Sequence, residues 1–212
     1  MIFVTGADRR FEAIVREWMR CLDMQGYQHR VYDLGNLGFG IKGFEEHDPT
    51  FVANGFYNTI GGKWCSTGLW KPRVVDDALA KCSDDLVYLD ADAHVRKPVV
   101  VNWDEFTIGV AEREWINSNK NPNNCKCAIK TMLRGDYNAG VIFFRNEGVT
   151  KNFVQDWSAE SNKLGNDQLA LSHCLNAGKV KLKVFPSAYN SLSPGAIIQH
   201  VTGRKKHGQA VR

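Results

Sequence analysis

An apolar run that ends in two carboxylates constrains the fold of this chain more than any other feature. The run is Leu86-Val87-Tyr88-Leu89, and Asp90-Ala91-Asp92 follows it directly. An extended segment of this pattern places Asp90 and Asp92 on one side of the chain, at the carboxyl end of a strand. Two carboxylates there suit Mg²⁺ or Mn²⁺, whose open positions are commonly filled by phosphate oxygens of a ligand. The alternative is a solvated turn with local hydrogen bonds from the aspartates.

Strand and helix patterns alternate along most of the chain. Predicted strands cover residues 2–5, 29–34, 85–89, 106–111, 137–144, 180–185 and 197–201. Predicted helices cover residues 8–26 and 71–82, a segment capped by Thr150, and a segment from a cap at Asn166 to about Gly178. This alternation predicts an α/β fold in which helices flank a largely parallel central sheet and ligands bind at the carboxyl ends of the strands.

Length and composition bound the kind of protein. The chain has 212 residues, 43% hydrophobic and 24% charged, which predicts a single domain over residues 1–212. No apolar run reaches about 18 residues and the first residues lack a secretory signal, so neither a transmembrane segment nor secretion is expected. Six cysteines without metal or disulfide spacing indicate reduced thiols and a cytosolic protein. The net charge of +4 comes without an aromatic-interleaved basic stripe, so nucleic-acid binding is not expected.

The C-terminal segment carries a second set of candidate ligands. His200, Gly203 and Lys206 form a His-x-x-Gly-x-x-Lys pattern. A neutral imidazole can complete a Mn²⁺ shell begun by carboxylates, glycine permits a close backbone approach, and lysine can place a positive charge on a phosphate. Each of these residues, taken alone, is equally consistent with a solvent-exposed surface position. Together with the paired aspartates, the pattern points to a metal and diphosphate site.

Four ordered segments resemble the metal-dependent glycosyltransferases of the GT-A fold, most of all the retaining type related to glycogenin and bacterial lipopolysaccharide galactosyltransferases. The segments are Asp90-Ala91-Asp92, Asn138-Ala139-Gly140, Asn166-Asp167-Gln168 and the pattern from His200 to Lys206. The resemblance implies a GT-A fold with a mostly parallel sheet, either as a minimal enzyme or as a domain of a longer protein. A weaker resemblance is to the glycosyltransferase domains of large algal viruses.

The resemblance also implies ligands and residue roles. The donor would be a UDP-sugar and the acceptor a sugar or glycoconjugate, with Mn²⁺ or Mg²⁺ held by Asp90, Asp92 and His200. The other implied donor contacts are Ala91 between the two aspartates, Gly203 and Lys206 at the diphosphate, Asn138, Ala139 and Gly140 at the sugar and acceptor pocket, Asp167 and Gln168 beside the sugar, and Val4, Thr5, Gly6 and Asp33 at the uridine. Lys71 is either a second phosphate contact or a surface lysine at a helix start. Asp92 is the firmer metal ligand, because Asp90 could reach the ribose instead.

The expected chemistry is hexosyl transfer with retention of configuration. Departure of UDP leaves an oxocarbenium-like sugar that needs a neutral or anionic neighbour, so Gln168 and Asp167, with Asn138 in the sugar pocket, are the catalytic candidates. The divalent ion and the last lysine of the C-terminal pattern would stabilise the departing diphosphate. An inverting enzyme would need a carboxylate base, for which Glu112 and Glu114 are the candidates.

The chain departs from the family pattern at two places. His207-Gly208 stands where the family usually has Pro-Trp, and Asn166 stands where many members have aspartate. A non-catalytic nucleotide-sugar-binding module and an Asp-x-Asp phosphohydrolase are the alternatives, although His94 replaces the threonine or valine typical of the second class. A dehydrogenase or a nucleotidyltransferase would need a glycine-rich loop that Gly6-Ala7-Asp8-Arg9 does not supply. The sugar, the acceptor and the oligomeric state stay open.

Overall fold

The structure is a computed structural model that describes residues 1–44, 70–111 and 137–201. Its strands are β1 (Ile2–Asp8), β2 (Gln28–Gly35), β3 (Leu86–Leu89), β4 (Ala93–Val95), β5 (Ile108–Ala111), β6 (Val141–Phe144), β7 (Leu182–Phe185) and β8 (Ile198–His200). Its α-helices are α1 (Glu12–Asp23), α2 (Trp70–Lys81), α4 (Gly148–Leu164) and α5 (Asp167–Asn176). Short 3₁₀ helices cover Arg9–Phe11, Trp103–Glu105 and Ser187–Tyr189. None of the helices in these described ranges is long and apolar enough to cross a membrane.

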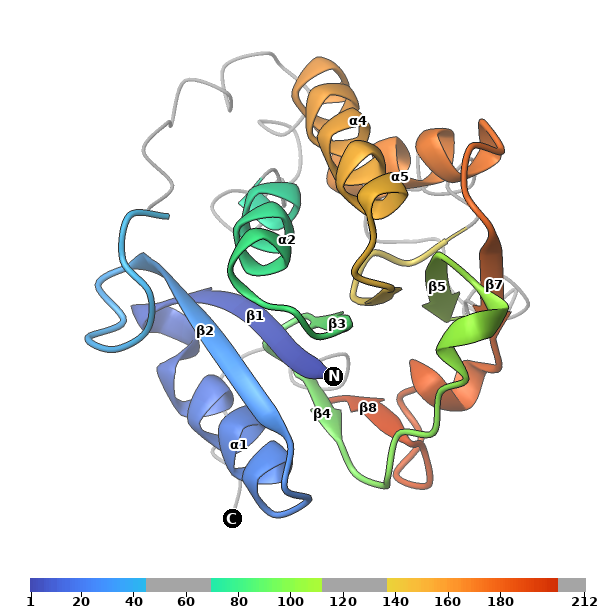
Figure 1. Cartoon of the computed structure of the whole chain (residues 1–212). Coiled ribbons are helices and arrows are strands. Elements are labelled where there is room, and N and C mark those ends of the chain that lie inside the picture. Colours follow the sequence, from blue (N-terminus) through green and yellow to red (C-terminus); the bar gives the residue numbers. More distant parts are fainter. Residues whose placement is uncertain (45–69, 112–136, 202–212) are drawn as a thin grey trace, which may run out of the picture.

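Six strands form the central sheet in the order β2-β1-β3-β6-β5-β7 (Figure 1). The β1–β2, β1–β3 and β5–β7 pairs are parallel, whereas β6 is antiparallel to both of its neighbours. The predicted α/β fold with a mostly parallel sheet is therefore confirmed. The antiparallel β6 has a consequence for the site, because the segment before β6 meets the segment after β3 at one edge.

Helices cover both faces of the sheet, and each face has its own apolar core. Helices α2, α4 and α5 pack on one face, while α1 and the small β4–β8 sheet pack on the other (Figure 1). Side chains of a strand alternate between faces, so Val4 of β1 joins the first core and Phe3 joins the second. Burying one such side chain contributes about 1.5–3 kcal/mol, which fixes the register of β1.

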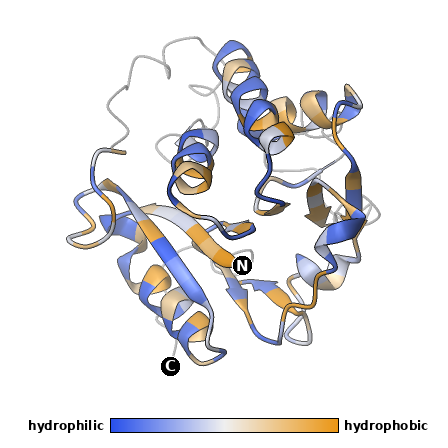
Figure 2. Cartoon of the chain, viewed as in Figure 1, coloured by the Kyte–Doolittle hydropathy of each residue, from blue (hydrophilic) through white to orange (hydrophobic). Residues whose placement is uncertain are grey.

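Helix α1 follows the predicted apolar spacing. Val15, Trp18 and Leu22 have no exposed surface, and Figure 2 shows both polar and apolar residues along α1, as expected for a helix with one face on a sheet. The helix begins at Glu12 rather than at Asp8. Asp8 ends β1, and its carboxylate accepts a hydrogen bond from the Arg10 amide at 2.8 Å, which starts the intervening 3₁₀ turn.

Two further boundaries test the predicted helix caps. The cap at Asn166 is confirmed, because its side-chain oxygen accepts a hydrogen bond from the Leu169 amide at 2.8 Å. The cap at Thr150 is wrong, since α4 begins at Gly148 and Glu147 is the capping residue. Thr150 lies buried in the first turn, where its hydroxyl donates to the Arg145 carbonyl.

Candidate functional site

Asp90, Asp92 and His200 converge beyond the carboxyl end of β3. Asp90 follows β3, Asp92 precedes β4, and His200 ends β8. One ligand atom from each residue lies within 4.8 Å of those from the other two, and His200 Nε2 is 3.8 Å from Asp92 Oδ1. The three side chains keep 29%, 25% and 17% of their surface exposed, so the cluster is open to a ligand from solvent.

A small two-stranded antiparallel sheet brings His200 to the aspartates. β4 pairs with β8 so that Ala93 lies opposite His200, and the Val201 amide donates to the Asp92 carbonyl at 2.9 Å. The His200 amide donates to the Ser191 carbonyl at 2.9 Å, which anchors the other side of β8. The sequence patterns predict no strand at residues 93–95, because three residues are too few to show a period. This strand is nevertheless the element that joins two distant segments into one site.

Gly140 forms the floor of this cluster. Its carbonyl accepts a hydrogen bond from the Asp90 amide at 2.8 Å, and its own amide donates to Asn138 Oδ1 at 2.6 Å. A Cβ atom at position 140 would lie 2.8 Å from Asp90 Oδ2 and 2.9 Å from His200 Cε1. Contacts this short do not occur for real Cβ atoms, so only glycine leaves room for the carboxylate and the imidazole.

The start of α2 packs against the strands and delivers Lys71. The Trp70 ring lies on Gly6, where a Cβ atom would be only 2.6 Å from Trp70 Cζ3. The same ring contacts Tyr88 of β3, with 6.1 Å between the ring centroids. Because these contacts fix the first turn of α2 over β1 and β3, Lys71 projects toward the end of β3.

Lys71 is an internal cation that links three segments. Its Nζ lies 3.0 Å from Asp90 Oδ1 and 3.0 Å from Asp167 Oδ2, and it donates to the Ala139 carbonyl at 3.3 Å. Only 12% of the side chain is exposed. Two carboxylates and one carbonyl therefore surround the ammonium group. The interpretation of Lys71 as a phosphate contact stays a prediction, and it requires that one of these contacts be exchanged for the ligand.

Charges in the cluster shift one another's pKa. Burial favours the neutral form of Asp90, but Lys71 and His200 outweigh it and hold the pKa of Asp90 below its ordinary value. For Asp167, burial outweighs the attraction to Lys71 and raises the pKa. Burial opposes the charge of Lys71, yet the two carboxylates raise its pKa, so the cation persists at neutral pH. Asp90 therefore stays firmly ionised, whereas Asp167 beside it accepts a proton more readily.

The junction between α4 and α5 presents Asp167 and Gln168. Helix α4 ends at Gly165, whose φ of 63° reverses the chain, and Asp167 is the first residue of α5. The Trp157 indole donates to the Asp167 carbonyl at 2.8 Å and fixes this junction against α4. Asp167 is turned toward Lys71. Gln168 is half-buried, and its side chain makes no hydrogen bond to any residue in the described ranges.

The residues predicted to meet uridine on β1 lie inside the fold. Val4 and Thr5 have no exposed surface, and Gly6 lies beneath the Trp70 ring. The Thr5 hydroxyl is buried, with no hydrogen-bond partner among the described residues. Val4, Thr5 and Gly6 lie within β1, which continues to Asp8, and a uridine contact there stays a prediction.

Asp33, the other predicted uridine contact, organises the loop that follows β2. Its Oδ1 accepts hydrogen bonds from the amides of Gly35 and Leu37 at 2.9 and 3.0 Å, and Lys42 pairs with its Oδ2. The carboxylate has no exposed surface. Burial would raise the pKa of Asp33, but Lys42 and the two amides lower it. Both oxygens thus have protein partners, and a contact with a nucleotide stays a prediction.

Several predicted positions lie outside the described residues. These are Gly203 and Lys206 of the C-terminal pattern, together with Glu112 and Glu114. Their roles stay predictions.

The structure adds Tyr88 to the site. Its hydroxyl donates to Asp90 Oδ1 at 3.0 Å, so Asp90 is held by both a phenol and an ammonium group. A signal for this contact exists in the sequence, because residues two apart in a strand lie on the same face and Tyr88 precedes Asp90 by two. No local pattern could have placed Lys71 between two carboxylates from different segments.

The donor set fits a divalent cation. Two carboxylates and an imidazole supply hard oxygen atoms and one nitrogen, a combination compatible with Mn²⁺ or Mg²⁺. The missing side chain at Gly140 leaves these three groups free to approach one another. The cluster can therefore hold a cation that also binds an anionic ligand, with Asp167 and Gln168 nearby to contact the rest of that ligand.

Comparison with known proteins gives matches in structure only. No protein-family model and no curated protein sequence matches the chain. An active-site mutant of LgtC superposes with a TM-score of 0.59 at 15% identity, covering 97% of this chain and 89% of that one. The galactosyltransferase LgtC in complex with donor and acceptor sugar analogues gives 0.52 at 16% identity, with coverages of 96% and 88%.

A glycosyltransferase involved in the glycosylation of the major capsid of PBCV-1 is also similar. Its TM-score is 0.58 at 10% identity, and the match covers 95% of this chain and 94% of that one. The glycosyltransferase GlyE of Streptococcus pneumoniae TIGR4 gives 0.57 at 14% identity, and the match covers 55% of GlyE. At these identities the comparisons establish a shared fold. The expected glycosyltransferase fold is therefore confirmed.

Proposed function

We propose that this chain is a divalent-metal-dependent glycosyltransferase that transfers a hexose from a UDP-sugar to a sugar or glycoconjugate acceptor, with retention, as a single domain. The observation that carries the proposal is the cluster of Asp90, Asp92 and His200, which lies beside the Lys71–Asp167 pair in a fold shared with glycosyltransferases. A partly exposed cation site next to further polar side chains suits a ligand with a diphosphate at one end and a sugar at the other.

Asp90, Asp92 and His200 would hold Mn²⁺ or Mg²⁺. A bound divalent ion would neutralise the negative charge that develops on the departing diphosphate. The protein contributes orientation. Tyr88 and Lys71 fix the Asp90 carboxylate through two contacts to its Oδ1, which leaves Oδ2 for a cation. Because the pKa of Asp90 is held low, that oxygen stays anionic at neutral pH.

The sugar of the donor would lie between the Asn138–Gly140 turn and the start of α5. Asp167 has its Oδ2 at the Lys71 ammonium, so its role in this proposal is to hold that cation and line the pocket. Gln168 has a neutral amide without a partner in the described part of the chain. LgtC offers a parallel, since one of its active-site mutants replaces a glutamine with glutamate. We therefore assign Gln168 to the reacting face of the sugar.

Retention follows from the chemistry that Gln168 can perform. When the bond to UDP breaks, positive charge grows on the anomeric carbon, and an amide oxygen is a neutral dipole that can stabilise it. A base that activates the acceptor from the opposite face would mark an inverting enzyme. Among the described residues near the cluster, Asp167 is the remaining carboxylate; burial raises its pKa, but its Oδ2 is engaged by the Lys71 ammonium rather than placed for an acceptor.

Isothermal titration calorimetry with a panel of nucleotide sugars, with and without Mn²⁺, tests the proposal. We expect a UDP-sugar to bind only in the presence of Mn²⁺, and expect the chain to release UDP slowly from that donor. Binding without UDP release across several acceptors would instead indicate a nucleotide-sugar-binding module. Release of inorganic phosphate from phosphate esters, without any affinity for UDP-sugars, would indicate a phosphohydrolase.

A further inference from the structure

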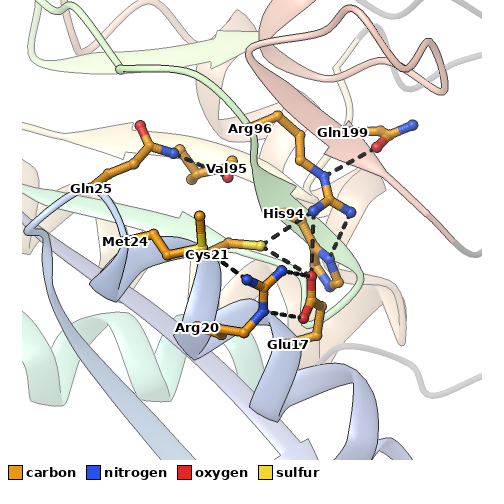
Figure 3. Close-up of polar contacts among 9 residues, drawn as sticks. All are labelled: Glu17, Arg20, Cys21, Met24, Gln25, His94, Val95, Arg96 and Gln199. Atoms are coloured by element: carbon orange, nitrogen blue, oxygen red, sulfur yellow. Dashed lines mark hydrogen bonds and ion pairs between the residues drawn. The ribbon is translucent and has the colours of Figure 1, made fainter.

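A second group of potential metal ligands lies between α1 and the β4–β8 sheet. Ligand atoms of Glu17, Cys21 and His94 all lie within 4.8 Å of one another. Cys21 and His94 are only 6% and 2% exposed. Figure 3 shows these side chains around the guanidinium of Arg96, which reaches them from the end of β4. The spacing of these ligand atoms alone would allow a metal ion. The contacts that Arg96 makes with the same atoms argue against one.

The guanidinium of Arg96 is the cation of this group. Its Nη1 lies 3.4 Å from Glu17 Oε1 and 3.3 Å from Cys21 Sγ, and its Nη2 lies 3.4 Å from His94 Nδ1. Each of the three potential ligands therefore already faces a positive group, and Arg20 adds a second one at Glu17, 2.7 Å from Oε2. A divalent ion would have to displace both arginines.

His94 takes part in this group as a neutral acceptor. A guanidinium only donates hydrogen bonds, so His94 Nδ1 must accept and carry no proton. Burial, together with the charge of Arg96, lowers the pKa of His94 to about 4, which keeps the ring neutral at physiological pH. The His94 ring therefore stays neutral around physiological pH, and the group serves as a fixed structural contact.

Arg96 also binds the strand that carries His200. Its Nε donates to Gln199 Oε1 at 3.2 Å, and its backbone amide donates to the Ile197 carbonyl at 2.8 Å. Adjacent residues of a strand point to opposite faces. Holding Gln199 on the α1 side therefore leaves His200 directed at the aspartates. Gln25 adds a further contact from the end of α1, where its side chain donates to the Val95 carbonyl at 3.2 Å.

The three proposed metal ligands belong to two separate parts of the fold. Asp90 is attached to the central sheet through the Gly140 carbonyl, whereas Asp92 and His200 belong to the β4–β8 sheet. The distance between the parts depends on how this small sheet packs on the rest of the protein. Arg96 connects the small sheet to Glu17 and Cys21 of α1, in addition to the Gln25 contact and the apolar packing between them.

We propose that Arg96 is a positioning residue for the cation site, which it assembles by fixing the β4–β8 sheet to Glu17 and Cys21 of α1. This inference rests on the proposed function, since it assumes that Asp90, Asp92 and His200 bind a divalent ion. Arg96 contacts none of these three side chains in the contacts described above. It acts by setting the position of two ligands relative to the third.

The test compares the Mn²⁺ affinity of three variants of the full chain. Each variant is titrated with Mn²⁺, and electron paramagnetic resonance measures the free Mn²⁺. Arg96→Ala should weaken Mn²⁺ binding roughly 10-fold, the low end of what loss of outer-shell support costs. Arg96→Lys should be intermediate, because one ammonium cannot bridge Glu17 and Gln199 as a fork does. Arg20→Ala is the matched control, since Arg20 contacts the same Glu17 carboxylate but, among the described residues, bonds only within α1 and its C-cap.

Amide hydrogen exchange provides a readout that does not depend on the metal. In Arg96→Ala, the amides of His200 and Val201 should exchange faster than in the wild type, while those of β1 should not change. With UDP-sugar and saturating Mn²⁺, turnover should return toward the wild-type value, because excess ion restores the ligand geometry. A purely structural loss would lower turnover at every Mn²⁺ concentration.

The outcomes separate this inference from the proposed function. Wild-type Mn²⁺ affinity in Arg96→Ala, alongside normal binding by the wild-type chain, would overturn the positioning role and leave the proposed function standing. Equal weakening in Arg20→Ala would also overturn it, because the effect would then come from Glu17 alone. If the wild-type chain bound no Mn²⁺, the proposed cation site and this inference would fall together.

Discussion

Lys71 Nζ lies 3.0 Å from Asp167 Oδ2, and this ion pair joins the first turn of α2 to the first residue of α5. The same ammonium lies 3.0 Å from Asp90 Oδ1. One internal cation thus holds a proposed metal ligand and a proposed sugar-pocket residue at a fixed separation. Without it, two carboxylates would face each other across a poorly solvated space.

Replacing Lys71 by methionine should therefore destabilise the protein. We expect the free energy of unfolding to fall by about 3 kcal/mol in urea denaturation, because the variant leaves two carboxylates partly buried without their cation. Lys81→Met is the matched control, since Lys81 forms an exposed pair with Asp77 on the same helix and should change stability by less than about 1 kcal/mol. Adding Asp167→Asn to Lys71→Met should recover part of the lost free energy of unfolding. Strictly additive effects of the two substitutions would contradict an energetic coupling between Lys71 and Asp167.

Replacing Asp92 by asparagine should abolish Mn²⁺-dependent binding of a UDP-sugar while the fold is retained. The amide keeps the size of the side chain but supplies no negative charge to a cation. Calorimetry measures the affinity, and circular dichroism checks the fold. Asp156→Asn on α4, which disrupts an exposed ion pair with Lys179, is the control. Unchanged affinity in Asp92→Asn would remove Asp92 from the ligand set.

Replacing Gly140 by alanine should damage the cation site through sterics alone. The added methyl group would lie within 2.9 Å of the Asp90 carboxylate and the His200 ring, so at least one of them must move. We expect Mn²⁺ affinity to fall by roughly 10-fold or more. Gly148→Ala is the matched control, because a Cβ atom there meets nothing within 4 Å. Equal Mn²⁺ affinity in both variants would show that Gly140 is not the floor of the cation site.

Replacing Gln168 by alanine should lower turnover far more than donor binding. If its amide stabilises charge that appears only in the transition state, kcat should fall by about 100-fold with little change in KM for the UDP-sugar. Gln155→Ala, at an exposed position on α4, should have wild-type kinetics. A change confined to KM would mean that Gln168 only binds the donor.

Acid should lower the stability that Glu17 contributes through its ion pair with Arg20 on α1. Hydrogen bonding by Arg20 lowers the pKa of Glu17 from 4.5 to about 2. Because the folded value lies below the unfolded one, the ionised group stabilises the fold above about pH 4.5, and this contribution is lost as pH falls toward 2.

Glu17→Gln should therefore be less stable than the wild type at neutral pH, and the difference should shrink over that pH range. Urea unfolding at a series of pH values measures this difference. Glu12→Gln, which disrupts the exposed pair with Arg16 on the same helix, is the control. A difference between Glu17→Gln and the wild type that is independent of pH would assign the effect to packing.

The glycosyltransferase interpretation required four short segments in a fixed order, and each of them alone has a simpler reading. Asp90 and Asp92 could have been a solvated turn, and His200 a surface residue. Their combination predicted a fold that the comparisons confirm. The uridine contacts are different in kind. The family resemblance implied Val4, Thr5 and Asp33 as uridine contacts, and the structure shows their side chains buried, with Asp33 already accepting hydrogen bonds from the Gly35 and Leu37 amides.

The sequence by itself determined the local elements and the chemistry they carry. Apolar spacing predicted the helix that contains Val15 and Trp18, and the apolar run before Asp90 predicted β3, because neighbouring residues set the period of a strand or helix. Tertiary structure alone decided that β6 runs antiparallel to β3, that a three-residue strand pairs with β8, and that Lys71 and Arg96 link distant segments. These are contacts between residues far apart in the chain, whose choice of partner depends on packing of the whole core and leaves no period in the local sequence.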